Sequence, residues 1–139
     1  TGIYYESKAE KLISNINVEE FNVSRFIKEM DKAYAVADII ISRSGAIAIS
    51  ELCCVGKPII LVPSPNVSEN HQYKNAQSLV NKNAAIVVED EHANRKLVDV
   101  LEELIKDESL KKSLSINIKD IAITDSADRI AKIALSLVK

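Results

Sequence analysis

The chain has 139 residues, which is enough for one domain with a hydrophobic core but not for two. Its 47% of hydrophobic and 27% of charged residues are typical of a soluble globular protein. The net charge of −2 argues against a nucleic-acid-binding protein, and no apolar run approaches the roughly 20 residues of a membrane-spanning helix.

Short apolar segments alternate with segments of helical periodicity along the chain. Helices are predicted at residues 5–16, 26–37, 46–55 and 71–82, and from about residue 94 onward. Strands are predicted at residues 18–23, 38–42, 59–62 and 84–88. This alternation predicts an α/β fold, with a Rossmann-like parallel sheet flanked by helices and joined by right-handed crossovers.

The start of the chain predicts an incomplete domain. A doubly wound domain normally begins with a strand, whereas this chain opens at a loop and does not begin with Met. We therefore expect residues 1–139 to be a single partial domain whose first strands lie upstream. We also expect a cytoplasmic protein, because no signal peptide is present and the two cysteines fit a reducing compartment.

Cys53 and Cys54 are adjacent on a predicted helix, and neighbouring helical side chains diverge. A disulfide between them is not expected. The two histidines, His71 and His92, are not spaced to complete a metal site with them. A structural role for both cysteines is the favoured interpretation.

A strand–turn–helix–strand unit at residues 37–63 is the most informative part of the sequence. We expect Ser44 to cap the helix, and the amides near Gly45, Ala46 and Ile47 to face outward at the positive end of the helix dipole. A diphosphate suits this geometry, and Gly45 would let it approach the backbone closely. The alternative is a capped core helix that binds no ligand.

Glu51 is a carboxylate on an otherwise apolar helix, where such a group needs a partner. Its two oxygens can accept both hydroxyls of a ribose diol. The alternative is a structural ion pair with Arg43 or Lys57. Arg43 itself could position a phosphate or cap the strand end.

Asn70, His71, Gln72 and Asn75 place hydrogen-bonding side chains at another helix start, which suits sugar hydroxyls. For His71, the alternative is a polar residue on a solvated helix face. The acidic run at residues 89–91 is predicted to be a solvated loop. The sequence contains no Walker lysine, no dinucleotide-binding glycine motif and no serine elbow.

The order and spacing of several short motifs carry a family resemblance. They are Arg43-Ser44-Gly45-Ala46, Ser50-Glu51, Gly56-Lys57-Pro58, Val62-Pro63 and Gln72-Tyr73 followed by Asn75-Ala76. Together with the segment that precedes them, they closely resemble the carboxy-terminal domain of the MurG family of peptidoglycan N-acetylglucosaminyltransferases. The similarity extends more weakly to the end of the chain.

The resemblance implies a GT-B fold of two Rossmann-like domains, of which this chain is part of the carboxy-terminal one, which holds UDP-N-acetylglucosamine. Backbone groups of Ile27 would contact the uracil edge. Gln72, together with His71, would hold the sugar hydroxyls. The donor would lie along Ala46, Ile47, Ala48, Ile49, Ser50 and Glu51, with the amides at the diphosphate and Glu51 on the ribose. No metal ion is implied.

The intact enzyme would transfer N-acetylglucosamine with inversion to a muramoyl-pentapeptide lipid, peripherally at the inner face of the bacterial cell membrane. The acceptor site and base would belong to an amino-terminal domain absent from this chain, so the chain alone should be inactive. Two rivals remain: another GT-B UDP-sugar enzyme, such as a glycolipid glycosyltransferase or a UDP-N-acetylglucosamine 2-epimerase, and a non-catalytic α/β interaction module.

Overall fold

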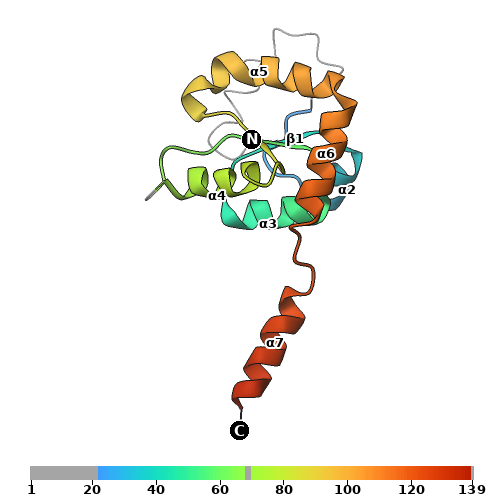
Figure 1. Ribbon diagram of the computed structural model, residues 1–139, viewed down its shortest axis with the longest axis vertical. Helices are drawn as coiled ribbons and strands as arrows, with labels where there is room; N and C mark the ends of the chain where they lie inside the picture. The colour runs from blue at the N-terminus through green and yellow to red at the C-terminus, as the bar shows by residue number, and fades with distance from the viewer. Residues whose placement is uncertain (1–21, 68–69, 139) are drawn as a thin grey trace. The chain divides into compact units, whose positions relative to one another are not determined.

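The computed structural model describes residues 22–67 and 70–138 (Figure 1). The chain divides into two compact units, Thr1–Val36 and Ala37–Lys139. The described part of the first unit contains helix α2 (Met30–Val36), which is shorter than the predicted helix at residues 26–37. The predicted helix at residues 5–16 and most of the predicted strand at residues 18–23 lie outside the described residues, and residues 22 and 23 are not in a strand.

The second unit is built on a parallel sheet with strand order β1-β2-β3. The strands are β1 (Ile40–Ser42), β2 (Ile59–Leu61) and β3 (Ile86–Val87). Ile40 pairs with Ile59 and Ile60 with Ile86, so β2 is central among the described strands. The predicted parallel α/β architecture is confirmed, although each strand is shorter than the apolar run that predicted it.

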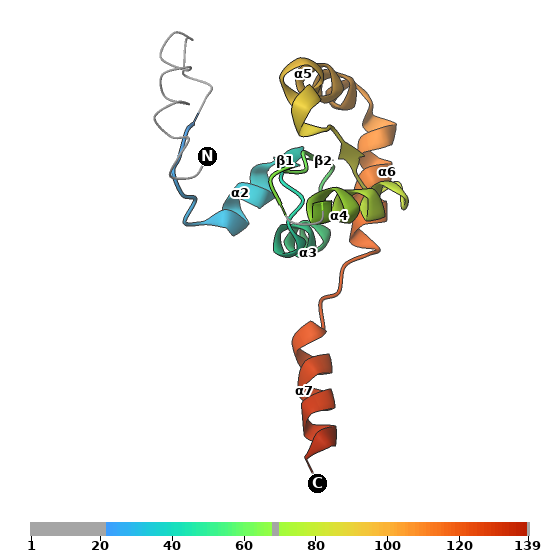
Figure 2. The same cartoon turned by 90° about the vertical axis from the view of Figure 1, so that its left-hand side faces the viewer.

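Helices cover both faces of this sheet. The helices of this unit are α3 (Ala46–Val55), α4 (His71–Val80), α5 (Asp90–Lys106), α6 (Glu108–Lys119) and α7 (Ser126–Leu137), of which α7 contributes no buried side chain. Figures 1 and 2 show α5 on one side of the sheet and α3 and α4 on the other. The bounds of α3 are those predicted from the sequence, because Gly56 ends the helix in the left-handed conformation, with φ 68.

The hydrophobic core lies on both sides of β2, whose three residues are completely buried. On one side, Ile60 and Val88 pack with Leu104 of α5 and Leu114 of α6. Since successive strand residues face opposite sides of a sheet, Ile59 and Leu61 face the side covered by α3 and α4. The sheet is therefore held from both faces, with its carboxyl-terminal edge left to the connecting loops.

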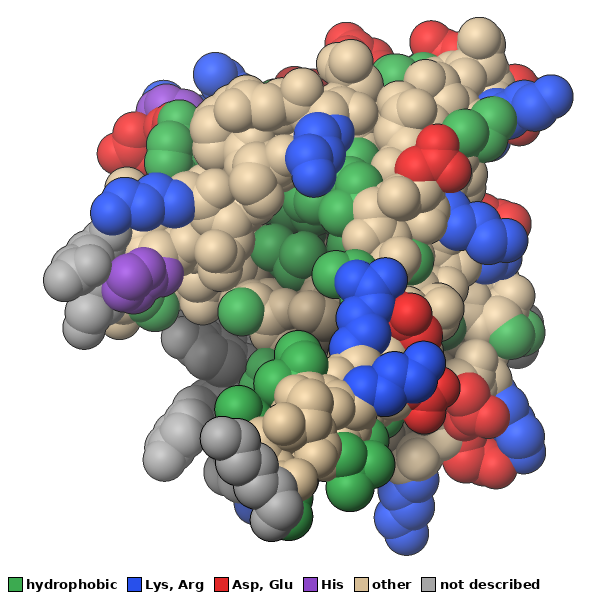
Figure 3. Space-filling view, turned by 60° about the horizontal axis from the view of Figure 1, so that its bottom comes forward, with side chains coloured by type: hydrophobic (Ala, Val, Ile, Leu, Met, Phe, Trp, Pro, Cys, Tyr) green, Lys and Arg blue, Asp and Glu red, His purple; other side chains and the backbone are tan. Residues whose placement is uncertain are grey.

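The surface carries charges of both signs. On the face drawn in Figure 3, Lys and Arg side chains are interspersed with Asp and Glu, among scattered exposed hydrophobic side chains. Within residues 22–67 and 70–138, none of the helices combines the length and the apolar character that crossing a bilayer requires.

Candidate functional site at the carboxyl edge of the sheet

Helix α3 starts directly after the turn that follows β1. Gly45 is its N-cap and makes no side-chain cap hydrogen bond. The prediction that Ser44 caps this helix is therefore wrong: Ser44 is fully buried, and its hydroxyl donates to the carbonyl oxygen of Gln72 at 2.8 Å. The first-turn amides of α3, which have no partner inside the helix, thus receive no side-chain cap.

Gly45 has space above it. Its φ of −65 and ψ of 147 are extended values that any residue adopts. Among the described residues, no atom lies within 4 Å of the position that a Cβ would take. Neither the backbone nor the neighbours therefore require glycine here. The open space lies over the amino terminus of α3, as the predicted close approach of a ligand would need.

The exposed face of α3 carries Glu51. This face also includes Ile47, Ser50 and Cys54, which follow helical spacing, and Ile47 is 81% exposed. Glu51 therefore lies on the solvent-exposed face of this largely apolar helix. The outlier on this face is Ile47, a large apolar side chain held in solvent beside the amino terminus of the helix. Ala48 and Ile49 are partly buried.

Arg43 holds neighbouring strand ends together. Its guanidinium donates to the carbonyl oxygens of Val62 at 3.1 Å and Pro63 at 3.4 Å, and it pairs with the carboxylate of Asp90. This arrangement favours the strand-end role of Arg43 over a direct phosphate role. The sequence left open an ion pair between Glu51 and Arg43. In the structure, the acidic partner of Arg43 is Asp90.

Asp90 was missed by the sequence analysis. The prediction that residues 89–91 form a solvated loop is wrong, because Asp90 and Glu91 form the first turn of α5. Acidic residues are favoured in a first turn by the helix dipole, and that signal was present in the sequence. The partnership with Arg43 was not predictable, because it joins residues far apart in the chain.

The first turn of α4 faces the same edge of the sheet. The side-chain oxygen of Gln72 accepts from the amide of Ser64 at 2.9 Å, and the amide group of Asn75 donates to the carbonyl oxygen of Ser44 at 3.2 Å. His71 is exposed at the start of the helix. The structure thus brings Gln72 and Asn75 to the turn before α3, and it uses one polar atom of each in an internal contact.

A cavity of about 450 Å³ adjoins this edge of the sheet, beside the amino termini of α4 and α5. Its lining includes Ser64, Tyr73 and Asp90. Ser64 and Tyr73 were not among the predicted site residues, although Tyr73 belongs to the Gln72-Tyr73 motif. Asn70, one of the polar residues singled out at the start of α4, also lines the cavity.

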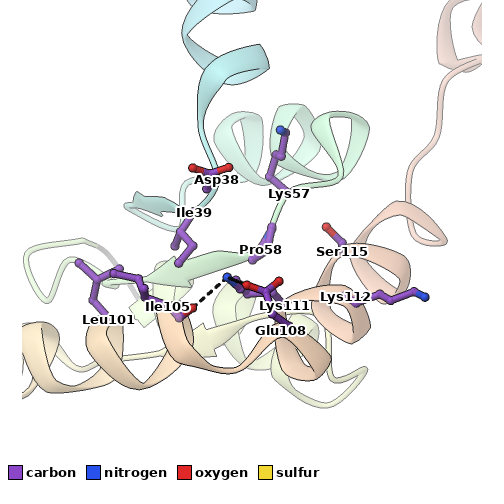
Figure 4. Close-up of a pocket in the computed structure, with 10 residues that line it drawn as sticks. All are labelled: Asp38, Ile39, Lys57, Pro58, Leu101, Ile105, Glu108, Lys111, Lys112 and Ser115. Atoms are coloured by element: carbon purple, nitrogen blue, oxygen red, sulfur yellow. Dashed lines mark hydrogen bonds and ion pairs between the residues drawn. The ribbon is translucent and has the colours of Figure 1, made fainter.

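A second cavity, of about 920 Å³, lies at the opposite edge of the sheet (Figure 4). It is lined at the amino-terminal ends of β1 and β2 by Ile39 and Pro58, with Lys111 and Ser115 contributed by α6. Ligands of parallel sheets bind at the carboxyl edge instead. None of the predicted site residues lines this cavity.

Ile27 belongs to the first unit, Thr1–Val36, and is 45% exposed there. The other predicted site residues belong to the second unit, so the predicted role of Ile27 at the uracil stays a prediction.

Within the described residues, Glu89, Glu91 and His92 place ligand atoms within 4.8 Å of one another, and all three side chains are exposed. Such exposed acidic groups are common without a metal ion. Cys53 is buried, Cys54 is exposed and both are free, which confirms the prediction that they do not form a disulfide. Burial raises the pKa of the Cys53 thiol, and the neighbouring Cys54 adds to the rise.

Comparison with known proteins identifies the family. The sequence model of the glycosyltransferase family 28 C-terminal domain matches residues 1–130. The UDP-N-acetylglucosamine--N-acetylmuramyl-(pentapeptide) pyrophosphoryl-undecaprenol N-acetylglucosamine transferase of Parabacteroides distasonis is 48% identical over 130 residues, which are 94% of this chain and 35% of that protein. The protein of the same name from Bacteroides fragilis is 48% identical over 135 residues, 97% of this chain and 36% of that protein.

The fold comparison agrees. The crystal structure of MurG from Acinetobacter baumannii matches with a TM-score of 0.85 and 23% sequence identity, over 98% of this chain and 40% of that chain. This likeness concerns the fold, and it confirms the expected Rossmann-like architecture. The chain spans about a third of the length of the curated relatives it matches, 35% and 36% in the two cases above. It belongs to the glycosyltransferase family 28 C-terminal domain family.

Proposed function

We propose that this chain is the donor-binding part of an inverting glycosyltransferase that moves N-acetylglucosamine from UDP-N-acetylglucosamine to a muramoyl-pentapeptide lipid in peptidoglycan synthesis. The observation that carries the proposal is the open, uncapped amino terminus of α3 beside Gly45. The family and the names of the relatives point to the same donor.

The donor is held along α3 in this proposal. The amides of Ala46 and Ile47 bind the diphosphate, since a helix amino terminus combines free N–H groups with a positive dipole end. Gly45 leaves room for the phosphates. Glu51, exposed one turn further along, accepts the ribose hydroxyls, and exposure makes it accessible to them.

The sugar lies toward α4. His71 is exposed at the first turn. The side-chain oxygen of Gln72 accepts from the amide of Ser64, and its side-chain NH2 group is the part that donates to the sugar in this proposal. The nearby cavity of about 450 Å³ is large enough for one sugar ring. Ile27 contributes backbone groups to the uracil.

The reaction is a displacement at the anomeric carbon. An acceptor oxygen forms the new bond while the bond to the diphosphate breaks, and UDP leaves with the electron pair. Negative charge grows on the departing diphosphate, where the amides of α3 stabilise it. We propose that this electrostatic contribution makes a metal ion unnecessary, and that the base and acceptor site lie in a preceding domain. The chain alone would then be inactive.

The acceptor fixes where the enzyme works. The names of the relatives specify an undecaprenol-linked acceptor. Because such a lipid resides in a bilayer, we propose that the whole protein contacts the cytoplasmic face of the membrane peripherally.

Calorimetric titration of UDP into the complete natural protein that contains this sequence tests the donor site. Glu51→Ala should weaken UDP binding about ten- to hundredfold, because it removes hydrogen bonds to a charged acceptor. Glu102→Ala is the matched control, since Glu102 is also an exposed helical glutamate but lies on α5. Equal affinities in all three proteins, or no UDP binding by the unmodified one, would reject the proposal. Product analysis then separates the UDP-sugar rivals. The proposal predicts transfer to a muramoyl lipid, whereas the rivals predict transfer to another acceptor or epimerisation of the UDP-sugar.

A further inference from the structure

Ser44 stands out because it is a buried polar side chain at the edge of an otherwise open site. It is 0% exposed, and no other polar or charged residue is fully buried in the part of the chain that the structure describes. Its hydroxyl reaches from the turn before α3 to the first turn of α4, where it donates to the carbonyl oxygen of Gln72 at 2.8 Å. A buried hydroxyl cannot contact a ligand itself.

Two further hydrogen bonds join the same segments. Asn75 of α4 donates to the backbone carbonyl of Ser44 at 3.2 Å, so Ser44 is bound through both its side chain and its backbone. The side chain of Gln72 accepts from the amide of Ser64, which fixes the loop after β2 to α4. Three separate segments at the carboxyl edge are thus joined by bonds that no local sequence pattern dictates.

We propose that Ser44 is a positioning residue, which sets the first turn of α4 relative to the amino terminus of α3. The inference deepens the proposed function and rests on it. α3 carries the amides for the diphosphate and α4 carries the polar groups for the sugar. The Ser44 hydroxyl therefore couples recognition of the two halves of one nucleotide sugar without touching either.

The coupling predicts a difference between two ligands. UDP does not need the α4 side of the site, whereas UDP-N-acetylglucosamine needs both α3 and α4 at the correct separation. Ser44→Ala removes the hydroxyl that donates the hydrogen bond, with little change in volume. Helix α3 should still begin at Ala46, while the first turn of α4 loses its hydrogen bond to residue 44. We expect the affinity for UDP-N-acetylglucosamine to fall about tenfold and that for UDP to change less than about twofold.

Ser115→Ala supplies the matched control. Ser115 of α6 also donates to a distant backbone carbonyl at 2.8 Å, but its acceptor is Gly56 at the far end of α3. Figure 4 shows Ser115 at the cavity on the opposite edge of the sheet. Its loss should lower thermal stability by a similar amount while both nucleotide affinities stay unchanged.

The experiment is calorimetric titration of UDP and UDP-N-acetylglucosamine into the complete natural protein and its variants. The readout is the ratio of the two affinities, which a loss of general stability does not move. If Ser44→Ala does not fold, Ser44→Cys keeps a weaker donor of similar size and should shift the ratio in the same direction by less.

An unchanged ratio in the folded Ser44 variant, or an equal change in Ser115→Ala, overturns the positioning role while leaving the donor site intact. Absence of UDP binding by the unmodified protein overturns the proposed function, and the positioning role with it.

Discussion

At the scale of single residues, the two glycines that bound α3 occupy their positions for different reasons. Gly56 has a φ of 68, and a Cβ there would meet the Cδ of Lys119 at 3.3 Å. Gly45 has ordinary extended backbone angles, and its Cβ position meets no described atom within 4 Å. The folded backbone thus accounts for Gly56 but not for Gly45, which is the difference that the proposed ligand site predicts.

The two glycines should separate in a stability measurement. Gly56→Ala should lower the free energy of unfolding by about 1–2 kcal/mol, because alanine is strained in the left-handed region. Gly45→Ala should change it by less than about 0.5 kcal/mol, since a weaker N-cap offsets a less flexible unfolded chain. Urea denaturation followed by circular dichroism measures both. A comparable loss in both variants would remove the argument that Gly45 is kept for a ligand.

The adjacent cysteines should differ in reactivity. Burial, and then the neighbouring Cys54, raise the pKa of the Cys53 thiol, whereas Cys54 is exposed. Since the thiolate is the nucleophile, iodoacetamide should label Cys54 first and Cys53 only on unfolding, as read by peptide mass spectrometry. A thiol whose folded pKa is raised favours folding below its unfolded pKa of about 8.5, and that contribution is lost as the pH rises above it. Equal labelling rates under native conditions would contradict the buried placement of Cys53.

At the scale of elements, local signals predicted most of the second unit. The bounds of α3 followed from Gly45 before it and Gly56 after it. The strands came out shorter than their apolar runs, because pairing rather than composition decides where a strand begins. The amide of Ile40 donates to the carbonyl oxygen of Pro58 at 3.0 Å, and pairing starts there, so Asp38 and Ile39 stay outside β1.

The candidate site was predicted in its position but not in its internal contacts. Sequence reasoning placed Ser44, Gln72 and Asn75 at the carboxyl edge of the sheet, where the structure has them, yet it gave Ser44 a local capping role. The contact that the structure shows joins residues 44 and 72, and no periodicity or motif encodes a pairing across that separation. Glu51 was selected as the one carboxylate on an otherwise apolar helix. The structure shows it exposed, so its proposed role rests on this exposed position beside Ile47 and on the family.

At the scale of the whole molecule, the stabilising core is confined to the sheet and the helices around it. Leu104 and Ile118 are completely buried, in α5 and α6. Ile130, Ile133 and Leu137 form an apolar stripe at helical spacing on α7. None of the described side chains of α7 is buried, and these three are all more than half exposed. The apolar stripe of α7 therefore adds nothing to the core of this chain.

Two substitutions of the same kind test this division. Ile118→Ala should lower the free energy of unfolding by about 3 kcal/mol, because it leaves a cavity in a closed core. Ile133→Ala, at a side chain that is 62% exposed, should change it by less than about 0.5 kcal/mol. Urea denaturation of the chain followed by circular dichroism measures both changes. A loss in Ile133→Ala comparable to that in Ile118→Ala would mean that α7 packs on the core in solution. No loss in Ile133→Ala would agree with the exposed position of this side chain.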